Sequence, residues 1–336
     1  MSQQRAVRVV VVRRGGPEVL QLVEESMPEP APGEVRLRVL AAGISAYDRM
    51  ERSRWFPGFP RPPYTPGLDL VGMVDALGAG VTEPVRGSVV AGGPYAQGGC
   101  YASDVCRAAD TLVPVPDGVD LAEAVCLVTD YLTARHVMHD TAQVRLGERV
   151  LVQGAGGGVG TALLELSALA GLEVYGTASS HNHDLVSTLG ATPIDYRTDD
   201  VAARVRELTG DGVDVVFDPI GGAAQLRQSY RCLRPGGRLV WFGVAAISRS
   251  GVRVIPESLV TRLLLDLRRD GRHAPITREE PPAEQRRHLA GLLDLLAAGD
   301  VRPVVTERMR LTQAADAHAL LERGGHAGKV VLVAHT

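Results

Sequence analysis

The sequence predicts an α/β protein in which a doubly wound parallel sheet is joined to a second, all-β module. Two observations carry this prediction. From Glu148 to Phe242, apolar strand patterns alternate with helix patterns, whereas the part before residue 125 contains short β-type segments separated by turns rich in glycine and proline. With 336 residues, the chain also exceeds the usual size of one domain, so we expect two domains.

The segment Glu148–Gly160 (ERVLVQGAGGGVG) is the clearest motif. Its apolar half, Val150–Val152, is typical of a strand buried on both faces. Ala155, Gly157 and Gly160 then have the spacing of a dinucleotide-binding turn, which needs a bare backbone so that a pyrophosphate can approach amide groups. The alternative is a plain connecting turn, but the strand before it and the helix after it favour nucleotide binding.

The all-β module is expected to form strands at Val7–Val12, Val35–Val39, Val71–Ala76, Ser88–Ala91 and Leu112–Val115. Ala41–Arg54 runs from a strand end into a polar helical turn, and Leu121–Met138 is helical by pattern. We expect this second helix to cross into the other domain.

The α/β domain is expected to contain the strands Val150–Gln153, Glu173–Thr177, Pro193–Asp195, Val213–Asp218 and Arg238–Phe242. Its helices are expected at Thr161–Gly171, Asn182–Leu189, Asp200–Leu208 and Ala223–Leu233. Beyond Ser248 the pattern is weak, apart from an apolar helix-like Leu259–Leu267. The end of the chain is expected to return to the first domain as His288–Ala298, Val301–Glu307, Leu311–Leu321 and Val330–Val333.

Composition excludes several classes of protein. The net charge of −3 favours neither nucleic acid nor an acidic membrane surface, and no apolar run approaches the roughly 20 residues of a membrane helix, so we expect a cytoplasmic protein. Four dispersed cysteines without a CxxC pair argue against a disulfide framework and a four-cysteine zinc site. Lysine occurs once, at Lys329, so lysine-dependent chemistry rests on that residue alone.

Seven segments carry a resemblance to a known family: AAGISAYD (41–48), PYTPGLDLVG (63–72), YLTA (131–134), GERVLVQGAGGGVG (147–160), DVVFDPIGG (214–222), LRPGGRLVWFG (233–243) and ERGGHAGKVVL (322–332). Their order resembles the medium-chain dehydrogenase/reductase superfamily, specifically its zinc-free quinone oxidoreductase (zeta-crystallin) branch. The resemblance implies a GroES-like β-barrel catalytic domain at 1–125 and 273–336, a Rossmann doubly wound parallel sheet for NADP(H) at 126–272, and often a homodimer.

The resemblance also bears on metal binding. Zinc-dependent members carry a cysteine where Ser45 stands and a histidine where Leu68 stands, and serine and leucine do not form that zinc site. We therefore expect no metal. His136 and His139 on the crossover helix are an alternative pair of ligands, but a solvated helix face is the favoured interpretation.

The end of the second strand of the α/β domain predicts NADPH as the cofactor. No acidic residue occurs there before Asp184, so nothing repels a ribose 2′-phosphate. The resemblance places His183 where NADPH-using relatives carry a lysine and Tyr196-Arg197 at a second phosphate contact; a solvated turn is the alternative. The predicted cofactor contacts are Thr133, Ala155, Gly157, Gly158, Val159, Gly160, Ser179, Ser180, His183, Tyr196, Arg197, Gly243, Val244 and Lys329.

Zinc-free relatives transfer a hydride to the β-carbon of an enone, enal, quinone or enoyl thioester, and hydrogen-bond donors stabilise the resulting enolate. Many relatives have asparagine at the position of Ser45, so this serine is a departure that weakens the expected donor. Tyr47 and Tyr64 are candidate replacements or packing residues. Asp48 and Arg52 either contact the substrate or form a structural ion pair with each other.

The substrate is expected to be small and hydrophobic. The adjacent aromatic residues Trp55 and Phe56, in a proline-rich loop, favour a flat apolar ligand, although anchoring of the loop is an equal alternative. Lys329 either reaches the cofactor or ends its strand. Two other functions stay open: a carbonyl or alcohol oxidoreductase, and an NADPH-binding protein without turnover.

Overall fold

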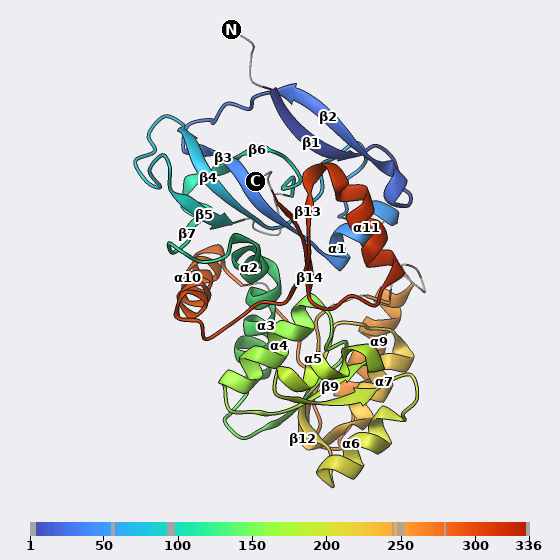
Figure 1. Ribbon diagram of the computed structural model, residues 1–336. Helices are drawn as coiled ribbons and strands as arrows, with labels where there is room; N and C mark the ends of the chain where they lie inside the picture. The colour runs from blue at the N-terminus through green and yellow to red at the C-terminus, as the bar shows by residue number, and fades with distance from the viewer. Residues whose placement is uncertain are drawn as a thin grey trace. The chain divides into compact units, whose positions relative to one another are not determined.

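The computed structural model describes residues 5–54, 58–92, 98–243, 245–246, 251, 253–278 and 280–333. The chain divides into two compact units, Met1–Leu132 with Glu280–Thr336, and Thr133–Glu279. In Figure 1 the first unit runs from blue to teal and returns from orange to red, and the second runs from green to orange. The sequence placed the two junctions at 125/126 and 272/273.

The first unit is built mainly of antiparallel strands: β1 (Arg5–Val11), β2 (Leu20–Ser26), β3 (Glu34–Ile44), β4 (Leu70–Leu77), β5 (Val89–Gly92), β6 (Asp104–Ala108), β7 (Val113–Pro114), β13 (Val305–Arg310) and β14 (Lys329–Val333). The long β3 organises the sheet. One of its edges pairs with β4, while the other is shared by β6, at residues 34–38, and β14, at residues 41–44. This branching lets the end of the chain complete the fold that its beginning starts.

Helices of the first unit are α1 (Ala46–Ser53), α2 (Leu121–Cys126), η3 (Leu127–Tyr131), α10 (Pro282–Ala298) and α11 (Ala314–Arg323). The helical stretch continues through α3 (Leu132–Arg135) and η4 (His136–Ala142), so the predicted helix at Leu121–Met138 is observed. Its η3 and η4 segments are π-helical, a conformation that is rare and often occurs at functional sites. Helix α10 begins earlier than predicted, because Pro282 at its first turn fits a helix start.

The second unit contains five parallel strands: β8 (Arg149–Val152), β9 (Glu173–Ala178), β10 (Ala191–Asp195), β11 (Val213–Asp218) and β12 (Leu233–Trp241), in the order β10-β9-β8-β11-β12. The helices are α4 (Gly158–Leu169), α5 (His183–Thr188), α6 (Val201–Thr209), α7 (Ala223–Arg231) and α9 (Val254–Asp266). The strand order reverses beside β8, so a ligand site is expected at the carboxyl end of β8.

The predicted α/β class, with a Rossmann sheet and a separate β-rich unit, is therefore confirmed. Each unit has its own apolar core. Val35, Leu37 and Leu70 are completely buried in the first, and Leu151, Val216 and Leu239 in the second. Within the described ranges, none of the helices combines the length and apolar composition needed to span a bilayer.

Candidate functional site

The glycine-rich turn lies at the carboxyl end of β8 and leads directly into α4, as predicted. Gly154 has a positive φ of 66°, and Gly157 is the residue that caps α4. A Cβ on Gly160 would lie 2.3 Å from the Gly154 carbonyl oxygen, so the close approach of helix and turn requires glycine there. Ala155 is fully buried and its amide donates to the Thr177 carbonyl at 2.9 Å.

The first turn of α4 offers amide groups to a ligand. The first hydrogen bond of the helix runs from the Thr161 amide to the Gly157 carbonyl, at 2.8 Å. The amides of Gly158, Val159 and Gly160 precede it and thus have no acceptor within the helix. Because the helix dipole also favours negative charge at this end, the turn fits a pyrophosphate group.

A buried polar network supports this turn from behind. The Thr177 hydroxyl donates to the Gln153 side-chain oxygen at 2.8 Å and accepts from the Gly154 amide at 3.1 Å. The Gln153 amide nitrogen donates to the Ser229 hydroxyl at 3.2 Å, which in turn donates to Asp218 at 2.7 Å. The network therefore joins the ends of β8, β9 and β11. Sequence reasoning did not find it, because its members lie far apart along the chain.

Two predicted phosphate-binding segments meet at one edge of the sheet. The parallel register places Asp195 of β10 opposite Ala178 of β9, so Ser179 and Tyr196 each follow their strand at the same edge. Ser179 is buried, Ser180 is exposed, and the His183 ring lies 3.3 Å from the Ala178 carbonyl oxygen.

Arg197 supplies the positive charge of this edge. Its guanidinium lies over the Tyr196 ring, 5.8 Å from the centroid, and the side chain is exposed. In the described part of the chain, no carboxylate forms an ion pair with it. An unpaired guanidinium held on an aromatic ring is well suited to an incoming phosphate group.

The remaining predicted cofactor contacts of this unit are less informative. Thr133 lies half-buried in α3. A Cβ on Gly243 would lie 2.4 Å from the Pro219 carbonyl oxygen, so this turn is tightly packed against the one after β11. Val244 lies outside the described residues, as do Trp55 and Phe56 of the first unit.

In the first unit, Ser45 caps helix α1. Its hydroxyl donates to the Asp48 carboxylate at 2.7 Å and accepts from the Asp48 amide at 3.2 Å, while the Ser45 amide donates to the same carboxylate at 2.7 Å. The other Asp48 oxygen accepts from the Gly67 amide at 3.1 Å. Asp48 is fully buried, and this burial raises its pKa to about 6 against the effect of the Ser45 hydrogen bond. The arrangement is a capping box that fixes the start of α1.

Arg52 is also fully buried, and it does not pair with Asp48. Its guanidinium forms an ion pair with Glu322 of α11 and donates to the Gly15 carbonyl at 3.1 Å. The predicted alternative of an Asp48–Arg52 ion pair is therefore wrong, because each side chain is directed to a different part of the unit. With no exposed surface, both residues position α1.

Tyr47 and Tyr64 differ in their access to solvent. Tyr47 is 39% exposed and packs edge-on against Phe59, and burial raises its pKa to about 12. The Tyr64 hydroxyl is buried, and burial raises its pKa too. Of the two, Tyr47 is the accessible donor, and its hydroxyl keeps its proton at neutral pH.

Glu51 is a candidate that sequence reasoning missed. It lies one helical turn after Tyr47, is 8% exposed, and burial together with the Asp48 carboxylate raises its pKa to about 7. Its negative charge adds to the effect of burial in raising the pKa of both Tyr47 and Tyr64. The spacing of four residues between Tyr47 and Glu51 was the available signal.

Lys329 lies between two buried carboxylates. Its ammonium is 2.8 Å from Asp69 and 3.3 Å from Asp130, and all three side chains are buried. Burial alone would lower the pKa of Lys329, but Asp130 and Asp69 outweigh it and raise that pKa. Asp69 also accepts from the Gly43 amide at 3.0 Å, so the cluster is tied to the strand that ends just before Ser45.

Comparison with known proteins agrees with this geometry. Residues 31–117 match a family model described as an alcohol dehydrogenase GroES-like domain, and residues 189–332 match one described as a zinc-binding dehydrogenase. A quinone oxidoreductase of Pseudomonas aeruginosa is 34% identical over 98% of this chain and 99% of its own length. The chain belongs to the medium-chain dehydrogenase/reductase superfamily.

Other similar proteins include the synaptic vesicle membrane protein VAT-1 homolog of Danio rerio, which is 30% identical over 96% of this chain and 69% of its own length. A mycobacterial protein whose structure was determined in complex with NADPH has a TM-score of 0.84 and 29% identity, covering 98% of this chain and 99% of that one. Membership of the superfamily makes the chain an oxidoreductase that binds a nicotinamide cofactor, and its zinc-free quinone oxidoreductase branch is compatible with these matches.

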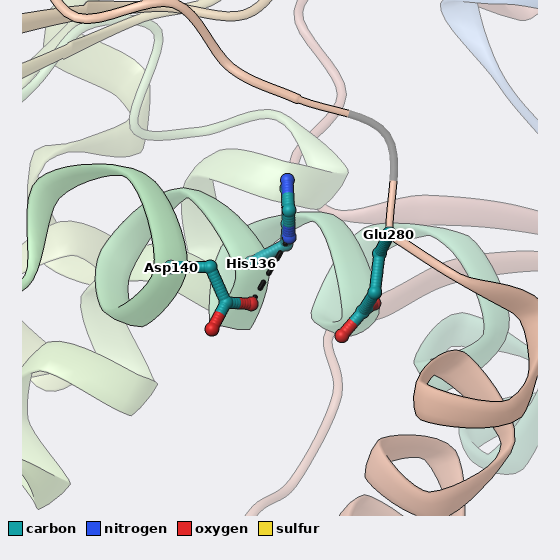
Figure 2. Close-up of side chains that lie close together, drawn as sticks. All are labelled: His136, Asp140 and Glu280. Atoms are coloured by element: carbon teal, nitrogen blue, oxygen red, sulfur yellow. Dashed lines mark hydrogen bonds and ion pairs between the residues drawn. The ribbon is translucent and has the colours of Figure 1, made fainter.

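Neither of the positions where zinc-dependent members of the superfamily carry their cysteine and histidine ligands has a metal-binding side chain in this chain. Ser45 is engaged in the capping box, and Leu68 is buried and carries no atom that can bind a metal ion. The alternative ligand His136 forms an ion pair with Asp140 at 3.0 Å (Figure 2), and its other ring nitrogen lies 2.6 Å from the Arg278 carbonyl oxygen. Glu280, also drawn there, belongs to the first unit, where it pairs with His288.

Within each unit, the structure brings together part of the predicted site. The glycine turn and its supporting network occupy the carboxyl edge of the Rossmann sheet, and Ser179, Ser180, His183, Tyr196 and Arg197 follow neighbouring strands of that edge. In the first unit, Ser45, Tyr47, Asp48 and Arg52 share α1 or its cap.

Proposed function

We propose that this protein is an NADPH-dependent reductase of conjugated acceptors, namely quinones, enones, enals or enoyl thioesters, and that it works without a metal ion. The observation that carries the choice of cofactor is Arg197, an exposed guanidinium without a carboxylate partner among the described residues, at the edge where the ribose of a bound dinucleotide lies in Rossmann folds. The choice of acceptor rests on the catalytic unit.

The residues of the second unit fit the cofactor. The amides of Gly158, Val159 and Gly160 would hold its pyrophosphate, because they have no acceptor within the helix. A Cβ on Gly160 would clash with the Gly154 carbonyl oxygen, so only glycine allows the turn to pack against the helix in this way. Arg197 and Ser180 would hold the 2′-phosphate, and no acidic side chain ends β9 to repel it. When bound, the cofactor supplies a hydride to the electron-poor carbon of the acceptor.

The catalytic unit favours an acceptor that holds negative charge within its own conjugated system. The Ser45 hydroxyl donates its hydrogen to Asp48, and the Leu68 side chain cannot bind a metal ion. Neither residue therefore strongly polarises an isolated carbonyl group. A conjugated acceptor needs less help, because delocalisation spreads the developing charge. The quinone oxidoreductases among the similar proteins support this choice.

Tyr47 is the proposed hydrogen-bond donor to the reduced acceptor. Its hydroxyl remains protonated at neutral pH, and its partial exposure gives access that the Tyr64 hydroxyl lacks. Glu51, with its pKa raised to about 7 by burial, would return a proton to the site after each turnover. Asp48 and Arg52 hold α1 in place and are positioning residues.

Fluorescence titration with NADPH and NADH tests the choice of cofactor. The Arg197→Ala variant should bind NADPH about 10- to 100-fold more weakly, the range expected for a lost charged hydrogen bond of about 1.5–3 kcal/mol, while its affinity for NADH stays the same. Arg204→Ala, which removes a partly exposed arginine paired with Glu207 on α6, is the matched control. A wild-type protein that prefers NADH, or an R197A variant that loses both cofactors equally, would contradict the proposal.

NADPH oxidation on a panel of quinones, enones, enoyl thioesters and simple ketones tests the reaction. We expect turnover of the conjugated acceptors. Turnover of simple ketones alone would instead support a carbonyl or alcohol oxidoreductase. Tight NADPH binding without turnover of any compound would support a cofactor-binding protein with no catalytic role.

A further inference from the structure

Arg14 joins helix α1 to the loop that follows it. Its two terminal nitrogens donate to different carbonyl oxygens, one at Glu51 in the last turn of α1 and the other at Pro60 in the loop. The guanidinium also lies over the Tyr64 ring, 6.0 Å from the centroid. One side chain thus contacts both ends of the segment between α1 and Tyr64.

The Arg14 contacts start from a fixed point of the fold, the end of α1. The last carbonyl groups of a helix have no partner within it, and basic side chains near that end bind them well. The Gly15 amide donates to the Arg52 carbonyl at 3.3 Å, so residues 14 and 15 together cap the helix. The bond to Pro60 therefore ties the loop to a helix end that is itself held in place.

Phe59, the residue before Pro60, packs against Tyr47 of α1. The ring centroids are 5.3 Å apart and the planes meet at 71°, an edge-to-face arrangement. Gly58, which precedes this pair, has a positive φ of 95° and is exposed, so the backbone on that side is a flexible type. The bond from Arg14 to the next residue, Pro60, is what fixes Phe59 beside Tyr47.

We propose that Arg14 is a positioning residue for substrate selection: it holds Phe59 beside the Tyr47 hydroxyl, and the two rings form a wall that favours planar cyclic acceptors. Quinones and cyclic enones present a flat ring that stacks on aromatic side chains, whereas open-chain enals and enoyl thioesters offer no ring to stack. This inference rests on the proposed reductase function, with Tyr47 as its hydrogen-bond donor, and it narrows the acceptor to one class.

The exposure of the two rings distinguishes a substrate wall from a simple loop anchor. An aromatic side chain that only anchors a loop contributes most when it is fully buried. Tyr47 is exposed and Phe59 is only partly buried. Because Arg14 already holds the loop by its backbone, part of the Phe59 ring remains accessible to a ligand next to the proposed donor.

Michaelis constants measured with NADPH on cyclic and open-chain acceptors test this selection. Arg14→Met keeps the length of the side chain but removes its donors, and Phe59→Leu keeps an apolar side chain but removes the ring. Each should raise the KM for 1,4-naphthoquinone and cyclohexenone by roughly 2- to 10-fold, the range expected for one lost aromatic contact, with little change in kcat or in the KM for crotonaldehyde. Arg13→Met, at the exposed neighbouring arginine that pairs with Glu18, is the matched control and should change none of these values.

Binding of an unreactive ring separates this inference from the proposed reaction. Calorimetric titration with 2-naphthol measures stacking without turnover, and R14M and F59L should each weaken this binding by roughly 2- to 10-fold, whereas R13M should not. A wild type that binds 2-naphthol in this pattern but reduces no acceptor would refute the reaction and leave the wall in place. 

The inference is overturned if the variants affect cyclic and open-chain acceptors equally, or if they bind 2-naphthol as tightly as the wild type. Circular dichroism verifies folding. Should R14M fail to fold, F59L decides the case, because it leaves both hydrogen bonds of Arg14 in place.

Discussion

Replacing the single lysine, Lys329→Met, gives the sharpest test of how the catalytic unit is held together. Lys329 is surrounded by Asp69 and Asp130, and all three side chains are buried. Methionine has a similar length and volume, so it removes the charge with little loss of packing. What remains is two buried carboxylates without a counter-charge.

The expected cost follows from this geometry. Removing one partner from a buried, hydrogen-bonded ionic group costs about 3–5 kcal/mol. For a unit of roughly 150–250 residues, each kcal/mol lowers the midpoint of thermal unfolding by about 2–4 °C, so the Tm of the unit should fall by about 6–20 °C. At 2.8 and 3.3 Å, the ammonium is in direct ionic contact with both carboxylates.

The loss should depend on pH. Burial already raises the pKa of Asp130, and the Lys329 ammonium opposes that rise, so the variant should raise it further. A carboxyl whose pKa is higher in the folded than in the unfolded state favours folding at low pH and loses that contribution as pH rises through the folded pKa. The stability difference between wild type and variant should therefore be smaller at pH 5 than at pH 8.

Thermal unfolding followed by circular dichroism at pH 5 and pH 8 measures both effects. The double variant Lys329→Met/Asp130→Asn is the control, because it returns the formal charge of the cluster to the wild-type value of about −1, and should regain much of the lost stability at pH 8. An equal loss at both pH values, with no gain in the double variant, would refute the electrostatic account and indicate a packing defect.

Two further predictions concern the network behind the glycine-rich turn and helix α1. Gln153→Leu should raise the KM for NADPH about tenfold with little change in kcat, because Thr177 then loses the acceptor that orients it towards the Gly154 amide. An equal fall in kcat would contradict a positioning role. Glu51→Gln should abolish a decline of kcat/KM above about pH 7, the pKa to which burial raises Glu51, and a profile identical to the wild type would exclude Glu51 as the proton source.

The sequence predicted the Rossmann sheet well, because its signals are local. Strands β8 and β11 at its centre are short, buried and largely apolar, and glycines such as Gly154 and Gly160 occupy positions where the backbone itself requires them. The β-rich unit was harder. Strands β2 and β6 were not predicted. In the case of β2 (LQLVEES), the strand pairs only with β1 and is largely exposed, so its sequence shows little alternation of apolar and polar residues.

The side-chain partners in the catalytic unit were beyond local signals. The Arg52–Glu322 ion pair joins residues 270 positions apart, so the motif AAGISAYD could not predict it. The motif likewise could not show that Arg52 does not pair with Asp48. For the same reason, the sequence presented Ser45 as a weakened donor, whereas the structure shows a helix cap. Its position in the motif alone would assign Ser45 as a hydrogen-bond donor to the substrate, but its hydroxyl already donates to Asp48.

Lys329 shows how composition and structure explain each other. Among its 36 lysine and arginine residues the chain has a single lysine, and this lysine lies where two carboxylates converge beside Gly43. A Cβ on Gly43 would lie 2.1 Å from the Lys329 Cε and 2.6 Å from an Asp69 oxygen, so the space is filled even without a side chain there. The wider, planar guanidinium does not fit this site without displacing the strand that leads to Ser45. The one lysine thus fits this site by its shape as well as by its charge, and it holds the end of β3 from which the proposed catalytic helix begins.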